Sequence, residues 1–156
     1  MIGDVVNISI KQFTRTKKKV LDENGEKVEI DVIVSDSPRN VLLAMKSDNK
    51  LNDFLRHNEF TGEHEIVADV KLDAISMRKG QLPSAFESYL SVYLENHFKV
   101  VFKTRALQDG IEAFFAEKTY NPVQEYMEHA YDSWDHKERL NQVFQTWLGA
   151  EDSIDV

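Results

Sequence analysis

The feature that most constrains the fold is an Asn24-Gly25 pair between two runs of alternating apolar residues. Both residues of such a pair tolerate a positive φ, which the tight turn of a β-hairpin requires. We therefore expect an antiparallel hairpin formed by residues 5–20 and 27–35. Because an isolated two-stranded hairpin is marginal in water, one of its faces is expected to pack against the rest of the chain.

After the hairpin, the spacing of apolar residues changes from that of strands to that of helices. Pro38 is suited to the first position of a helix that runs to about residue 47, because its missing N–H needs no partner there. The remaining expected elements are, in order, a short helix within 49–57, a turn at 58–63, a strand at 65–70, a loop at 71–82, helices that begin near residues 83, 104 and 122, and a last helix that ends at Gly149.

These expectations define an α+β fold: an N-terminal hairpin or small antiparallel sheet with short helices, followed by a mainly helical C-terminal half. We expect a mixed subdomain at 1–70, a loop or seam at 71–82, a helical subdomain at 83–149 and a frayed tail at 150–156. Aromatic residues at helical spacing are expected in the core, namely Phe86, Tyr89, Tyr93, Phe114, Phe115, Tyr126, Tyr131, Trp134, Phe144 and Trp147.

Composition limits the classes of protein that the chain can belong to. Its 156 residues suit about one domain, and 42% hydrophobic residues can form a core. The absence of cysteine excludes disulfides, thiolate zinc sites and cysteine nucleophiles. No apolar run reaches the roughly 18 residues of a membrane span, and the N-terminus lacks the pattern of a signal peptide. We therefore expect a cytoplasmic protein without membrane contact.

Charge is distributed unevenly along this acidic chain. The formal net charge is −8, yet residues 1–20 carry a net +4 and residues 105–156 carry a net −7. A chain of this charge is a poor candidate for gripping duplex DNA over a wide surface. Any contact with nucleic acid is therefore expected to be local.

The dense basic cluster lies in the first strand of the expected hairpin and has two interpretations. It can contact phosphates, since β-ribbons can lie along nucleic acid, or it can be a lysine-rich edge that blocks strand association. A second, weaker basic group lies in the expected loop at 71–82. The candidate nucleic-acid contacts are Arg15, Lys17, Lys18, Lys19, Arg78 and Lys79.

No recognised catalytic motif occurs: there is no phosphate-binding glycine loop, no GxSxG turn and no HExxH pair. His57 and His64 flank a turn and are interpreted as solvated loop residues rather than metal ligands. His129 and His136 are seven residues apart, which suits either a loose divalent-cation site on one continuous helix or, more simply, a polar junction between helices. We assign no catalytic, cofactor-binding or metal-binding residue.

The segment 118–152 carries the most specific pattern in the chain. It resembles the region that precedes the ATPase domain in the virulence-associated E family, which comprises primase–helicase-like replication proteins of phages, prophages and pathogenicity islands. The matching positions are Asn121, Pro122, Val123 and Tyr126, then Trp134, Asp135, Arg139 and Leu140, then Leu148, Gly149, Ala150, Glu151 and Asp152.

Two upstream segments, 40–45 and 58–62, are similar to the same family, so the resemblance spans about residues 38–152. His136 stands where the family has glycine. The family's Walker A loop lies downstream of the Gly-Ala-Glu-Asp motif, and this chain ends at Val156. The resemblance thus implies a piece that precedes an ATPase, and we assign no ATP hydrolysis to the chain itself.

Three functional hypotheses follow. The first is a non-catalytic accessory domain of a mobile-element DNA-replication helicase–primase protein, which positions DNA or subunits for an adjacent ATPase domain; its partners would be that domain, single-stranded or forked DNA, or a replication protein. The second is a protein-interaction module that docks a host replication protein through its acidic helical half. The third, a metal-dependent nuclease or other hydrolase, lacks supporting ligand spacing.

Overall fold

The computed structural model describes residues 12–137, and these fall into two compact units that divide between Asn121 and Pro122. The expected α+β class is confirmed: a two-stranded hairpin comes first, small sheets follow, and helices dominate the later part. The segment 71–82, where a loop or seam was expected, lies inside the first unit. Each unit is described by itself.

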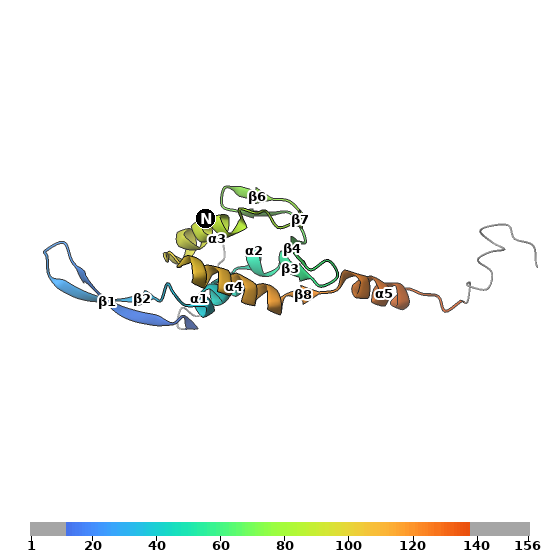
Figure 1. Cartoon of the computed structure of the whole chain (residues 1–156), viewed down its shortest axis with the longest axis horizontal. Coiled ribbons are helices and arrows are strands. Elements are labelled where there is room, and N and C mark those ends of the chain that lie inside the picture. The colour runs from blue at the N-terminus through green and yellow to red at the C-terminus, as the bar shows by residue number, and fades with distance from the viewer. Residues whose placement is uncertain (1–11, 138–156) are drawn as a thin grey trace, which may run out of the picture. The chain divides into compact units, whose positions relative to one another are not determined.

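The chain begins with a two-stranded antiparallel ribbon, β1 (Arg15–Leu21) and β2 (Lys27–Ile33). The Asn24-Gly25 turn is confirmed, and Gly25 has the positive φ of 82° that the turn needs. The ribbon extends away from the helices of the same unit (Figure 1). Every residue from 15 to 31 is exposed, so the expectation that one face packs against the rest of the chain is wrong for most of its length.

Two helices and a four-stranded sheet follow the ribbon. Helix α1 (Pro38–Ser47) begins at Pro38 as expected, and α2 (Asn49–Asn52) is shorter than expected. The sheet has the order β7-β4-β3-β8, in which β3 pairs antiparallel with β4 and parallel with β8. Its strands are β3 (Leu55–Asn58), β4 (Glu63–Ile66), β7 (Gly80–Gln81) and β8 (Thr119–Tyr120).

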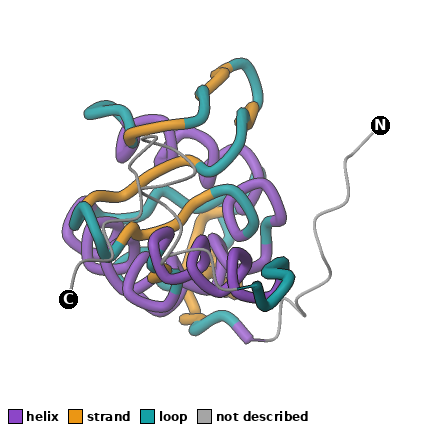
Figure 2. Tube along the Cα trace, turned by 90° about the vertical axis from the view of Figure 1, so that its right-hand side faces the viewer, coloured by secondary structure: helices purple, strands orange, loops and turns teal. Residues whose placement is uncertain are grey.

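The stretch expected to be a loop at 71–82 instead contains strands. β5 (Val70–Leu72) and β6 (Ile75–Met77) form a separate antiparallel pair, and β7 joins the main sheet. Val70, Leu72 and Met77 are buried. Three-residue strands are too short to show a period in sequence, which is why this segment was misassigned. Figure 2 shows the strands of the chain as short segments separated by loops and turns.

Two longer helices complete the first unit: α3 (Phe86–Phe98) and α4 (Thr104–Glu117). Helix α4 packs along α1, and Lys46 Nζ lies 2.5 Å from Glu117 Oε2 between them. The expected core aromatics Phe86, Tyr93, Phe114 and Phe115 are buried. The fully buried side chains that form the centre of the core include Val41, Met45, Leu51, Leu55, Ile66, Leu90, Leu94, Phe114 and Phe115.

Gly110 fixes how closely α1 and α4 approach. A Cβ atom on Gly110 would lie 2.5 Å from Val41 Cβ and 3.0 Å from the carbonyl oxygen of Pro38. Both neighbours are held by α1 itself and cannot move aside without moving the helix. A glycine in the middle of a helix normally costs stability, so its presence here is explained by packing.

The second unit contains one described helix, α5 (Pro122–Asp132), which begins at Pro122 as expected. None of its residues is buried. The expectation that Tyr126, Tyr131 and Trp134 belong to a core is therefore wrong for the described part of the chain. The expected last helix, with Phe144, Trp147 and the remaining motif residues from Arg139 onward, lies outside the described residues.

Within residues 12–137, every helix is too short or too polar to cross a bilayer.

We predict that Gly110→Ala destabilises the protein, although alanine is the better helix former by about 1 kcal/mol. Overpacking against Val41 should lower the free energy of unfolding by about 1–3 kcal/mol. Urea denaturation followed by circular dichroism measures this. Ser88→Ala, on the exposed face of α3, is the control and should be neutral or stabilising. A stabilised Gly110→Ala variant would show that α1 and α4 are not in close contact.

Candidate nucleic-acid interface

The register of the ribbon separates the basic cluster onto two faces. Arg15, Lys17 and Lys19 alternate along β1 and share a face with Glu29 and Asp31 of β2. Lys18 lies on the opposite face, directly across from Ile30. The four cations that are neighbours in sequence therefore do not form one surface.

The three cations on the first face are paired with carboxylates. Arg15 Nη1 lies 3.0 Å from Asp31 Oδ2, and Lys17 and Lys19 each approach Glu29 at 3.8 Å. Exposed pairs of this kind contribute about 0–1 kcal/mol. They nevertheless reduce the positive potential that a phosphate would meet on this face.

The ribbon as a whole is electrostatically balanced. Residues 15–31 contain five basic and five acidic side chains. Three of the acids, Asp22, Glu23 and Glu26, lie at the turn that forms its tip, where Asp22 Oδ1 accepts hydrogen bonds from the backbone N–H groups of Asn24 and Glu26. The tip would therefore repel nucleic acid, and attraction is confined to the part of the ribbon nearer its base.

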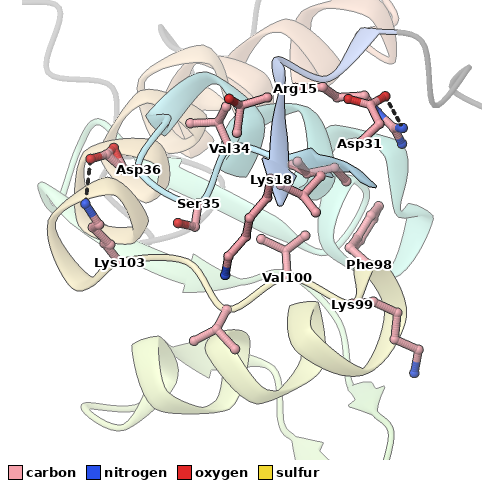
Figure 3. A pocket seen from close by; sticks show the side chains of 14 residues that line it. Arg15, Lys18, Asp31, Val34, Ser35, Asp36, Phe98, Lys99, Val100 and Lys103 are labelled. Carbon is pink, nitrogen blue, oxygen red and sulfur yellow. Dashed lines mark hydrogen bonds and ion pairs between the residues drawn. The ribbon is translucent and has the colours of Figure 1, made fainter. Parts of the chain in front are cut away.

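Lys18 is the cation of this cluster that has no ion-pair or hydrogen-bond partner within residues 12–137. Its side chain reaches into an open pocket of about 600 Å³ between the ribbon and the connection from α3 to α4 (Figure 3). Val32, Val34 and Val100 supply apolar walls of this pocket. An unpaired ammonium beside an apolar wall suits a ligand that is anionic and partly apolar.

Two further lysines that sequence reasoning did not select also line this pocket. Lys99 adopts a left-handed conformation at the C-terminal end of α3, with φ of 58°, and Lys103 precedes α4. Lys103 Nζ lies 2.7 Å from Asp36 Oδ2, so it is already compensated. With Arg15 and Asp31, the pocket lining carries four cations and two carboxylates.

Arg78 and Lys79 do not join the ribbon cluster. Both are exposed between β6 and β7, and neither lines the pocket. The backbone N–H of Lys79 donates to Asp69 Oδ1 at 2.8 Å, which fixes the turn. The structure thus provides two separate small basic sites rather than one continuous track.

The side chain of Asn40 positions the base of the ribbon. It is fully buried at the start of α1; its Oδ1 accepts from the Thr14 N–H at 2.8 Å, and its Nδ2 donates to the carbonyl oxygens of Thr14 and Val34 at 2.9 and 3.0 Å. These three bonds join the entry and exit of the ribbon to the helix.

The histidines expected in a loop lie on paired strands. His57 of β3 is the cross-strand partner of His64 of β4, and their Nδ1 atoms are 3.1 Å apart. The ring of His64 stacks on Phe115 with centroids 3.9 Å apart, and its Nε2 lies 3.7 Å from Glu112. The pair therefore continues the core packing at the sheet, and the loop assignment is wrong.

His129 and His136 do not share a helix, because α5 ends at Asp132 and His136 has a positive φ of 59°. The continuous helix that a shared cation site would need is therefore absent. Within residues 12–137, no group of three or more His, Asp or Glu side chains is arranged to hold a metal ion.

A polar cluster joins α3 to the segments around residues 48 and 73. The Tyr93 hydroxyl donates to Asp48 Oδ2 at 2.5 Å, and burial together with this carboxylate raises the pKa of Tyr93 well above its usual value. His97 Nε2 lies 2.9 Å from Asp73 Oδ1, and this hydrogen bond lowers the pKa of Asp73. Each polar group has a structural partner, and the cluster holds the β5–β6 turn against α3.

Helix α5 exposes a mixed acidic and aromatic surface. Tyr126, Met127 and Tyr131 are each more than 60% exposed, and Glu125 and Glu128 lie on the same helix. In the sequence these apolar residues look like core. Their exposure marks a candidate surface for a partner.

Comparison with known proteins adds no identification: the sequence matches no protein-family model, and a search of curated proteins finds no significant match.

We predict that Asn40→Asp loosens the ribbon. The substitution removes both donated hydrogen bonds and places a carboxylate against the carbonyl oxygens of Thr14 and Val34, which should cost about 3 kcal/mol of the free energy of unfolding. Urea denaturation measures the cost, and amide hydrogen exchange reports on residues 14–34. Asn24→Asp is the matched control, because Asp-Gly also suits the turn. Equal stability of the two variants would show that the hydrogen bonds of Asn40 do not hold the ribbon to α1.

Proposed function

We propose that this chain is a non-catalytic accessory domain of a DNA-replication helicase–primase protein from a phage, prophage or pathogenicity island, and that it positions DNA or subunits for an adjacent ATPase. The observation that carries the proposal is the resemblance of residues 118–152 to the region before the ATPase domain of virulence-associated E proteins. A reading frame that continues past Val156 into a Walker A loop within about a hundred residues would test the family directly.

The exposed ribbon supports a positioning role. A two-stranded arm can reach along a ligand while the buried core holds its base fixed. The DNA contact in this proposal is small: it consists of Lys18, with Lys99 beside it in the pocket, while the paired Arg15, Lys17 and Lys19 contribute less. A local contact of this kind agrees with the acidity of the whole chain.

We predict that single-stranded and forked DNA bind the full chain at low salt with a shallow salt dependence. Because Lys17 and Lys19 are paired with Glu29, Lys18→Gln should lower the affinity at least as much as Lys17→Gln and Lys19→Gln together. For single strands, the slope of log K against log salt should fall by about 0.7 for each lost phosphate contact. Fluorescence anisotropy measures both quantities.

Lys71→Gln, at an exposed position of β5, is the control and should leave the affinity unchanged. The pair Arg78→Gln and Lys79→Gln tests the second basic site in the same titration. If DNA does not bind at low salt, or if replacing Lys17, Lys18 and Lys19 together by glutamine has no effect, the ribbon has no role in DNA contact.

A second candidate function is favoured by the exposed surface of α5. A helix that carries Glu125 and Glu128 together with exposed Tyr126, Met127 and Tyr131 suits a protein partner with a basic, partly apolar groove. In this alternative, the acidic helical half docks a host replication protein.

The prediction of this alternative is a salt-sensitive complex that depends on α5. Tyr126→Ser with Tyr131→Ser should weaken binding of the partner at least tenfold, because exposed tyrosines at interfaces supply much of the buried area. Pull-down from host lysate at two salt concentrations, with and without these substitutions, provides the measurement. His129→Ser, at an exposed position of the same helix, is the control for general changes in α5. Recovery of the same replication protein by the tyrosine variant would contradict docking through α5.

A further inference from the structure

The ribbon has one face that is apolar and uncovered. We call this surface the valine face; it consists of Thr16, Lys18, Val20, Val28, Ile30 and Val32, which the register places together. Val20, Val28 and Ile30 are 39%, 44% and 43% exposed. Each of these residues is exposed, and exposed apolar strands of this kind favour pairing with another surface.

The two ends of the valine face differ in charge. At the tip, Asp22, Glu23 and Glu26 follow the end of β1, and within residues 12–137 no ion pair neutralises them. Lys18, in the middle of β1, extends its side chain into the pocket at the base, which Lys99 also lines, and neither has an ion-pair partner in the same part of the chain. The tip is thus anionic and the pocket at the base is cationic.

The apolar surface continues from the ribbon into the pocket. Val32 belongs to both, and Val34 and Val100 extend the apolar wall beyond it. The Lys18 side chain crosses this region in Figure 3 towards the connection that carries Val100. A strand that packs along the valine face would therefore end in the pocket, beside the unpaired lysines.

We propose that the valine face binds the ribbon of a second copy of this chain. The two ribbons lie antiparallel, valine face against valine face, so that the acidic tip of each copy enters the Lys18–Lys99 pocket of the other. Seven-residue strands are about 23 Å long in both copies, so the tip of one ribbon reaches the base of the other. The contact is isologous and closes as a two-fold dimer.

Charge decides in favour of a second copy over nucleic acid as the occupant of this face. A nucleic acid on the valine face would bring phosphates next to the three carboxylates of the tip, whereas a second ribbon brings those carboxylates to lysines. The opposite face, with Arg15, Lys17 and Lys19, stays outside the contact. The inference rests on the subunit-positioning part of the proposed function and is an alternative to its DNA contact, because the tip of the second copy would occupy the same Lys18–Lys99 pocket.

Sedimentation equilibrium of the full chain over a range of concentrations at low salt tests the proposal. We expect reversible monomer–dimer association that weakens as salt rises. Val28→Thr with Ile30→Thr should raise the dissociation constant at least tenfold, because threonine keeps the strand but removes apolar contact. Leu21→Thr, at an exposed apolar position on the opposite face, is the control and should leave the dissociation constant unchanged.

A charge exchange separates this arrangement from nonspecific association. Glu23→Lys with Glu26→Lys should also weaken the dimer at least tenfold, and the addition of Lys18→Glu and Lys99→Glu should restore most of the loss. Asp22 is left intact because it stabilises the turn. Circular dichroism confirms that each variant keeps its fold.

The proposal is overturned if the chain stays monomeric at all concentrations, if Leu21→Thr weakens association as much as Val28→Thr with Ile30→Thr, or if the charge exchange restores nothing. It is also overturned if Val28→Thr with Ile30→Thr lowers DNA affinity while the protein remains monomeric, since the valine face would then bind nucleic acid. A dimer that does not bind DNA contradicts only the DNA part of the proposed function. A monomer that binds DNA through Lys18 contradicts only the present inference.

Discussion

The buried amide of Asn40 is the interaction on which the accessible parts of this structure depend. An isolated two-stranded ribbon is marginal in water, and the ribbon here makes no core along most of its length. The three hydrogen bonds of Asn40 fix both of its strands to α1, and the bond from the Lys103 N–H to the carbonyl of Ser35 joins the same region to α4. The ribbon can therefore be exposed to solvent while its base keeps a fixed position on α1.

The packing of the core explains why α1, which holds the base of the ribbon, is rigid. Helices α1 and α4 approach closely because Gly110 leaves no side chain between them, and the buried Phe115 of α4 stacks on His64 of the sheet. Residues of the segments 40–45 and 58–62 serve this architecture. Asn40 holds the ribbon, and the buried Asn58 accepts hydrogen bonds from the N–H groups of Phe60 and Thr61 to shape the turn after β3.

The alternation of a β-strand gives adjacent residues different environments. Lys17, Lys18 and Lys19 look equivalent in sequence, yet two of them meet Glu29 and the third faces Ile30 and the pocket. This division could have been derived from the hairpin register once the Asn24-Gly25 turn was recognised. The contribution of Lys99 and the position of Lys103 could not, because they come from a connection more than 60 residues away and are brought to the ribbon only by packing.

The sequence alone determined the α+β class, the hairpin and its turn, and the starts of α1 and α5, because turn chemistry and proline geometry act between near neighbours. It did not reveal β5–β7, whose three-residue and two-residue strands are too short to show a period. Nor did it separate the buried Phe114 from the exposed Tyr126, since helical spacing marks an apolar face without saying whether anything covers it. Only the tertiary structure decided that, along with the pocket under Lys18, because both depend on contacts between segments distant in the chain.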